Sequence, residues 1–258
     1  MSKKLTEIFV TEIESLDSPL KEHVIELLNT SPQYITEIPS STTGKYHPND
    51  ELGADGMIKH ITKIIAFVYE IVRIEDYKKE ELDLLLSAAL LHDAFKCGKT
   101  KGKYTVKNHA ELIYNHIKKY IKNTDLIQQD VDKLEMLALI CVKHAGRWST
   151  DREKSIIVKA NPSQHVLNIC KSFHYADCLA SKRSIYEVMQ GKAVTPIDNN
   201  WTEKQKKFIK KIIGFKLEKI IDDGNKLVEQ FNKDGYITKD YASDFISKFK
   251  TTYPNYRG

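Results

Sequence analysis

The sequence has no apolar run long enough to cross a membrane. Its longest apolar stretch, around residues 84–91, is much shorter than the roughly 20 residues that a transmembrane helix needs. Residues 1–16 include Glu7, Glu12 and Glu14 and lack the apolar segment of a signal peptide. We therefore expect a cytoplasmic protein with no membrane partner.

Cysteine is scarce, and neither sign of charge dominates. The four cysteines, Cys97, Cys141, Cys170 and Cys178, show no CxxC spacing, which favours free thiols in a reducing compartment. Lys and Arg number 40 against 35 Asp and Glu, giving a net charge of +5 and a pI of about 8.8. This mild excess of positive charge permits an anionic substrate or a nucleic acid but requires neither.

No segment alternates apolar and polar residues with a period of two, so the predicted fold is all-α. We expect one helical domain over residues 1–192 and a helical C-terminal extension over residues 193–258. Oligomers could form through the extension. The predicted helices fall in residues 5–29, 56–73, 108–120, 130–143, 161–189, 201–222, 227–231 and 238–249, and residues 30–55 read as a long loop.

Residues 88–98 contain the dipeptide His92-Asp93 at the end of an almost wholly apolar helix. A helix that is apolar on all sides is buried, and an ionised carboxylate buried with it needs a proton, an ion pair or a cation. Imidazole beside carboxylate suits a divalent metal. The alternative is a helix end that faces solvent, with Gly98 as the stop.

Further candidate ligands fall on inward stripes or at the ends of other predicted helices. His60 lies beside the apolar stripe of residues 56–73, and His144 continues the stripe of residues 130–143. His109 is in the first turn of its helix, and Asp177 is on the buried face of residues 161–189. Taken singly, each histidine could be an ordinary core residue, and Asp177 could pair with Lys182 or Arg183.

The order H…HD…H…H…D resembles the HD-domain metal-dependent phosphohydrolase superfamily over residues 44–183. The matching motifs are GMIKH at residues 56–60, ALLHDAFK at residues 89–96 and HYAD at residues 174–177. The preceding run GKYHP, residues 44–48, is similar to that of HD domains in bacterial 3′–5′ exoribonucleases and uncharacterised phage proteins.

This resemblance implies that residues 1–192 form an HD-type metal-binding helical domain, a helical bundle around one or two divalent ions. His60, His92, Asp93 and Asp177 would hold one ion, and Asp93 could bridge to a second ion held by His109 and His144. Two-metal relatives often carry a His-His pair at the fourth position, where this sequence has Lys143-His144. The second site is therefore short of a ligand, although Lys143 could instead bind phosphate.

The expected chemistry is hydrolysis of a phosphoester of a nucleotide or oligonucleotide by metal-activated water. The ligand types favour Mn, Fe, Co, Ni or Zn, with Mg in a carboxylate-rich position. Asp93 and Lys96 are the expected catalytic residues, and Lys96, Lys99, Arg147 and His47 the expected substrate contacts. Two alternatives stay open: a non-catalytic nucleotide-binding or structural module, and a di-iron oxygenase similar to myo-inositol oxygenase.

Overall fold

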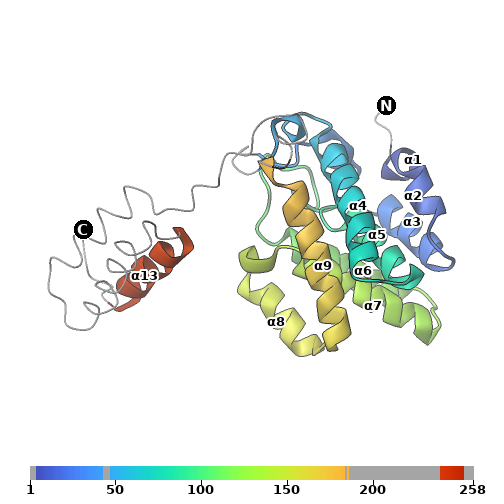
Figure 1. The fold of residues 1–258 in the computed structure, drawn as a ribbon. Helices are drawn as coiled ribbons and strands as arrows, with labels where there is room; N and C mark the ends of the chain where they lie inside the picture. Colours follow the sequence, from blue (N-terminus) through green and yellow to red (C-terminus); the bar gives the residue numbers. More distant parts are fainter. Residues whose placement is uncertain (1–3, 43–46, 184, 186–238, 253–258) are drawn as a thin grey trace, which may run out of the picture. The chain divides into compact units, whose positions relative to one another are not determined.

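A computed structural model describes residues 4–42, 47–183, 185 and 239–252, and these form an all-α fold with no strand among them (Figure 1). The chain divides into two compact units, Met1–Val194 and Thr195–Gly258. The helices of the first unit are α1 (Leu5–Ile8), α2 (Val10–Glu14), α3 (Leu20–Asn29), α4 (Gly56–Ile74), α5 (Lys79–Leu91), α6 (His109–Asn123), α7 (Gln128–Lys143), α8 (Asp151–Ala160) and α9 (Gln164–Ala180), with short 3-10 turns η1 (Gln33–Glu37), η2 (Asn49–Glu51) and η3 (Gly146–Trp148).

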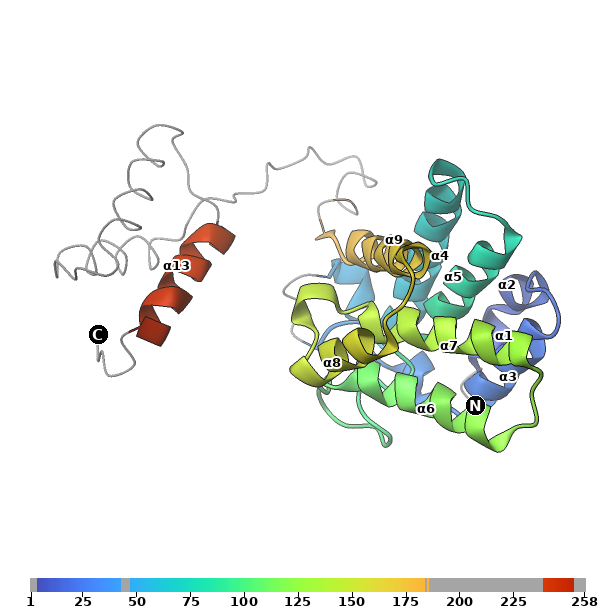
Figure 2. The same cartoon turned by 90° about the horizontal axis from the view of Figure 1, so that it is seen from below.

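Helix α5 is the core helix of the first unit. Every residue from Asp83 to Leu91 is buried, as the apolar sequence predicts, and the helix packs against α3, α4, α7 and α9. Around it, α4 packs on α9 and α6 packs on α7, while α8 and the group α1–α3 lie at opposite sides of the unit in both views (Figures 1 and 2). Helix α5 therefore contacts four other helices of this unit.

The predicted loop over residues 30–55 contains two 3-10 turns, η1 and η2, that are held by backbone hydrogen bonds. The Ser40 amide donates to the Glu51 carbonyl at 3.0 Å, and the Met57 amide donates to the Ile38 carbonyl at 3.1 Å. These bonds attach the segment to the start of α4. The prediction of one long loop was therefore wrong for these two stretches.

Three predicted helix boundaries differ from the structure. Helix α5 ends at Leu91, so His92 and Asp93 follow the helix, although both are still buried. Helix α9 begins at Gln164 rather than Asn161, because Asn161 has a φ of 44° and ends α8. The predicted helical stretch 5–29 is divided into α1, α2 and α3, and α3 begins at Leu20 with Pro19 at the N-cap.

Helix α8 was not predicted at all, although its start follows an ordinary rule. The Thr150 side chain accepts from the Glu153 amide at 3.2 Å, and the Glu153 carboxylate accepts from the Thr150 amide at 2.7 Å. This capping box satisfies two amides that the first turn would otherwise leave unpaired.

Of the second unit, the structure describes helix α13 (Lys239–Thr252), where a last helix is predicted; Ala242, Phe245 and Phe249 are buried in it. The predictions for residues 193–238 lie outside the described residues. No described helix is both long enough and apolar enough to span a bilayer.

Candidate metal centre

The six predicted ligands lie on five helices or in the residues that directly follow them, and they share one interior region. Helix α4 carries His60, the segment after α5 carries His92 and Asp93, α6 begins at His109, His144 follows α7, and α9 carries Asp177. His60 and Asp93 are 1% and 4% exposed, and His92 and His144 are also buried. The Asp177 side chain is 17% exposed, so this region reaches solvent at that edge.

Three of the histidines are held in the same way. The Nδ1 atoms of His92, His109 and His144 lie 3.1, 2.9 and 2.7 Å from the carbonyl oxygens of Ala89, Val106 and Cys141, each three residues earlier. A carbonyl only accepts, so each Nδ1 carries a proton and donates it. In the neutral ring, Nε2 is then left as a lone-pair donor, the form in which imidazole binds a metal.

These Nε2 atoms meet at Asp93, and we call Asp93, His92, His109 and His144 the Asp93 cluster. Asp93 Oδ1 lies 3.2 Å from His109 Nε2 and 3.7 Å from His144 Nε2, and Oδ2 lies 3.5 Å from His92 Nε2. The Nε2 atoms of His109 and His144 are 3.1 Å apart. Neutral rings would direct two lone pairs at each other there, so the arrangement requires a proton or a cation.

Two buried atoms of the Asp93 cluster have no hydrogen-bond partner: His92 Nε2 and Asp93 Oδ1. An unpaired buried polar atom costs about 1–3 kcal/mol, so a partner is expected. Nitrogen and carboxylate oxygen form the donor set of a divalent transition metal. Among the described residues, ligand atoms within 4.8 Å of one another form three groups. One holds His60, His92 and Asp93, one holds Asp93, His109 and His144, and one holds His47, Glu51 and His60. The predicted ligand Asp177 is in none of the three. The two groups that share Asp93 fit one or two ions.

His60 and Asp177 form the other half of the centre. His60 Nε2 lies 3.0 Å from Asp177 Oδ1, and His60 Nδ1 lies 3.4 Å from Glu51 Oε2. The His60 ring is 6.0 Å from the His92 ring, centroid to centroid. Asp177 pairs with this histidine, so it needs no lysine or arginine partner.

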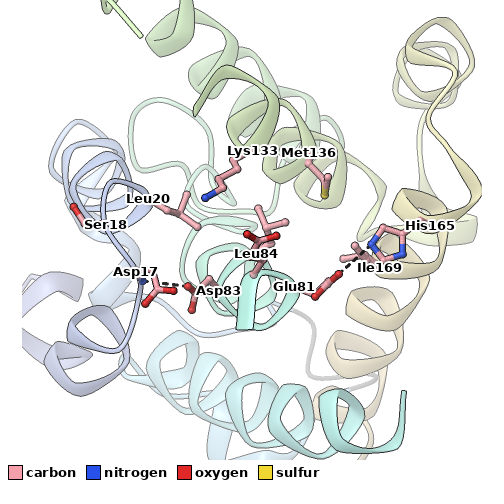
Figure 3. Close-up of a pocket in the computed structure, with 11 residues that line it drawn as sticks. Asp17, Ser18, Leu20, Glu81, Asp83, Leu84, Lys133, Met136, His165 and Ile169 are labelled. Atoms are coloured by element: carbon pink, nitrogen blue, oxygen red, sulfur yellow. Dashed lines mark hydrogen bonds and ion pairs between the residues drawn. The ribbon is translucent and has the colours of Figure 1, made fainter. Parts of the chain in front are cut away.

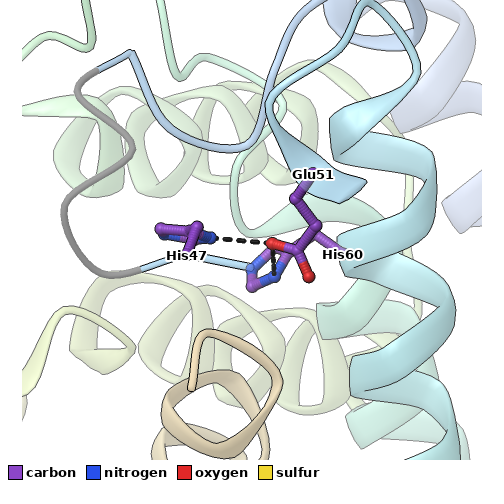
Figure 4. A group of neighbouring side chains, drawn as sticks. All are labelled: His47, Glu51 and His60. Carbon is purple, nitrogen blue, oxygen red and sulfur yellow. Dashed lines mark hydrogen bonds and ion pairs between the residues drawn. The ribbon is translucent and has the colours of Figure 1, made fainter. Parts of the chain in front are cut away.

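Glu51 was not among the predicted site residues, although its side chain is fully buried beside His60. Its Oε2 atom accepts from Ser40 Oγ at 2.7 Å and lies 2.8 Å from His47 Nδ1, and its Oε1 atom accepts from Lys63 Nζ at 2.8 Å. Figure 4 shows the carboxylate reaching both the His47 and the His60 rings. Glu51 therefore holds His47 and orients His60.

The pKa values show which groups are charged without a metal. Burial lowers the pKa of His92 to about 4, and burial followed by the charge of His109 lowers that of His144. Burial would raise the pKa of Asp93, but Lys96 and the neighbouring histidines hold it well below its usual range. The result is an ionised carboxylate beside two neutral imidazoles, the protonation states that a metal requires.

The predicted substrate contacts lie in different surroundings. Lys96 is buried and its ammonium group pairs with Asp93. His47 is held by Glu51, and the Arg147 guanidinium lies 5.0 Å from the centre of the Trp148 ring. Lys99 is exposed and lines a groove of about 660 Å³ beside α6.

A second hollow, of about 390 Å³, lies away from these residues (Figure 3). It is lined by Asp17, Glu81, Asp83 and His165 among others, and none of the six candidate ligands borders it. The Asp17 amide donates to Asp83 at 3.1 Å, and His165 lies 3.2 Å from Glu81. Glu81 and Asp83 thus have partners in the fold, and we assign the hollow no role.

A helical bundle that gathers histidines and aspartates at one interior point defines a class of metal-binding α-helical proteins. The family model of the HD domain matches residues 57–179, a range that includes all six candidate ligands. Residues 57–179 are therefore identified as an HD domain. No curated protein and no solved structure matches it.

Proposed function

We propose that the protein is a metal-dependent phosphohydrolase that cleaves a phosphoester of a nucleotide or oligonucleotide. The supporting observation is the Asp93 cluster, in which three imidazole nitrogens meet at one buried carboxylate whose Oδ1 atom lacks a hydrogen-bond partner. HD-domain proteins are mostly metal-dependent hydrolases, which agrees with this chemistry.

His60, His92, Asp93 and Asp177 would hold one divalent ion, and Asp93, His109 and His144 a second. Such an ion, when bound, lowers the pKa of water from 15.7 toward about 7 and stabilises negative charge on phosphate oxygens. The three carbonyl contacts at Nδ1 keep the imidazoles in the binding tautomer, so little reorganisation is needed.

Lys96 is the group best placed to neutralise phosphate. Its ammonium group contacts Asp93 Oδ2. An ion bound by Asp93 would take over that partner, and Lys96 would then be left to pair with an anionic substrate. Arg147, three residues after His144, supplies a second cation at the same end of α7.

We propose a nucleotide substrate because the chain is mildly basic and because its sequence resembles exoribonuclease HD domains. The likeness to exoribonucleases stays a prediction. A panel of deoxynucleoside triphosphates, nucleoside monophosphates, cyclic nucleotides and short single strands, assayed with Mn, Co, Ni, Zn or Mg, would identify the ester.

The experiment that tests the function compares Asp93→Ala with Asp130→Ala. Asp130 is also a buried carboxylate beside a histidine, 3.7 Å from His23, but it belongs to neither ligand group. We expect Asp93→Ala to lose both bound metal, measured by elemental analysis, and hydrolysis of bis-p-nitrophenyl phosphate, while Asp130→Ala keeps both. Turnover that survives Asp93→Ala would refute the proposal, and oxygen uptake by the iron-loaded protein would favour the oxygenase alternative.

A further inference from the structure

Two exposed aromatic rings, each with a cation over its face, lie close in sequence to the candidate ligands. Tyr104 is 61% exposed, with Lys103 Nζ 5.3 Å from its ring centre. Trp148 is 69% exposed and has Arg147 over its ring. A single exposed aromatic residue needs no explanation, but here two cation-aromatic pairs occur within six residues of His109 and His144.

Both pairs flank the same end of the α6–α7 pair. Tyr104 belongs to the loop that leads to His109, and this loop is held by the Val106 amide, which donates to the Lys96 carbonyl at 2.8 Å. Trp148 ends the turn η3 that follows His144.

The segment after Trp148 returns to the first turn of α6. There Arg152 Nε lies 2.8 Å from Glu111 Oε1, and the Glu111 amide donates to Glu153 at 3.3 Å. The two aromatic residues are therefore carried by the two loops that approach the Asp93 cluster at the N-terminal end of α6.

We propose that the pairs Lys103–Tyr104 and Arg147–Trp148 are stacking platforms for the bases of a single-stranded nucleic acid, whose phosphate backbone reaches the Asp93 cluster between them. The proposal rests on the proposed function and narrows its substrate from a nucleotide or oligonucleotide to a single-stranded polymer. Exposed aromatic rings stack on any unpaired base, and adjacent cations neutralise the neighbouring phosphates. Bases within a duplex do not present their faces in this way.

The groove beside α6 supports a polymer over a mononucleotide. It is lined by Lys99 and Lys119, for which no ion pair is found among the described residues, and by the amide side chains of Asn115 and Asn123. Lys99 lies at the start of the loop that carries Tyr104. From Leu112 to Asn123 the groove follows about 17 Å of helix at 1.5 Å per residue, which gives a strand beyond the first nucleotide a basic path.

The chain offers a matched control. Tyr175 is 50% exposed and has Lys171 Nζ 5.5 Å from its ring centre, so it is a pair of the same kind. It lies on α9 two residues before Asp177, which places it about 200° around the helix from that ligand. Tyr175 therefore points away from the centre.

The test is fluorescence anisotropy of a labelled ten-nucleotide single strand with the full chain in EDTA, where hydrolysis is blocked and circular dichroism confirms folding. Trp148→Ala and Tyr104→Ala should each weaken binding about 5-fold to 100-fold, the usual effect of one lost stacking platform. Trp148→Phe should retain most of the affinity, Tyr175→Ala should be unchanged, and Lys119→Gln should reduce the slope of log K against log salt by about 1.

The inference fails if Trp148→Ala and Tyr104→Ala bind the strand like the wild type, or if a mononucleotide or a duplex of the same sequence competes as well as the single strand. These outcomes are independent of the proposed function, which hydrolysis of bis-p-nitrophenyl phosphate reports. If the protein binds the strand but hydrolyses nothing, the proposed function is refuted and the stacking platforms are kept. If it hydrolyses the ester but does not bind the strand, the stacking platforms are refuted and the proposed function is kept.

Discussion

His109 and His144 face each other through their Nε2 atoms at 3.1 Å, although the second nitrogen of each ring already has a backbone carbonyl to which it donates. Two neutral rings held in this way present lone pair to lone pair, next to an ionised carboxylate. The fold thus builds a site that requires a proton or a cation between these rings and the Asp93 carboxylate.

Glu51→Gln should weaken metal binding by about 10- to 100-fold, as expected when a carboxylate that orients a ligand histidine is removed. The matched control is Asp50→Asn. Asp50 contacts the same Lys63 ammonium at 3.0 Å, but no contact with His60 is found for it. Calorimetric titration with Mn²⁺ measures the affinity of each variant. Equal affinities in the two variants would show that Glu51 does not contribute to metal binding.

Lys96→Met should have opposite effects on metal binding and turnover. Without the ammonium group that pairs with Asp93, the metal has no competitor and should bind more tightly, whereas kcat should fall by about 100-fold because a charge that stabilises the phosphate is lost. Lys101→Met is the control, since Lys101 is exposed and lies 3.6 Å from Glu37. Weaker metal binding by Lys96→Met would contradict the competition between the ammonium group and the metal.

Gly146→Ala should destabilise the loop after His144. Gly146 has a φ of +54°, and a Cβ atom there would overlap the His174 ring, whose Nδ1 donates to the His144 carbonyl at 2.6 Å. Strain of this kind costs about 1–3 kcal/mol. Urea denaturation measures the loss, and the double variant Gly146→Ala/His174→Ala should recover the part that comes from the clash. If the double variant recovers no stability, the whole loss comes from the backbone conformation at Gly146 and none of it from the clash.

Metal binding should release protons at pH 8. Burial alone would lower the pKa of His60, but its contacts with Asp177 and Glu51 outweigh burial and raise the pKa to about 9. The metal-free ring is therefore protonated below about pH 9 and must lose its proton to bind, so affinity should rise about tenfold per pH unit and level off above pH 9.

Calorimetry in two buffers of different ionisation enthalpy counts these protons. We expect about one proton from His60 and none from His92. His109 should release a further fraction of a proton, because burial lowers its pKa but the contact with Asp93 outweighs burial and raises it. Binding with no proton release at pH 8 would show that His60 is not a ligand.

The sequence predicted the parts of the fold that repeat along the chain. Apolar residues at helical spacing placed α4, α6 and α7 within a few residues of their bounds, and the order of histidines and aspartates indicated the superfamily. Helix α8 escaped prediction because most of its residues are exposed, so it has little apolar stripe.

Other features depend on contacts between distant residues, which a single sequence does not display. Glu51 lies in a segment without periodicity, and its role depends on an approach to His60 and Lys63 that only the folded loop brings about. The carbonyl partners of the three imidazoles could have been suspected from their common spacing of three residues. Their geometry depends on where each helix begins or ends, which is the least predictable feature of a sequence.

The most direct test of the centre is anomalous diffraction from crystals soaked in Mn²⁺. The account predicts a peak about 2.0–2.3 Å from a carboxylate oxygen of Asp93, with Nε2 of His109 and His144, or of His60 and His92, completing its coordination. Peaks elsewhere on the protein, with Asp93 still paired only with Lys96, would contradict it.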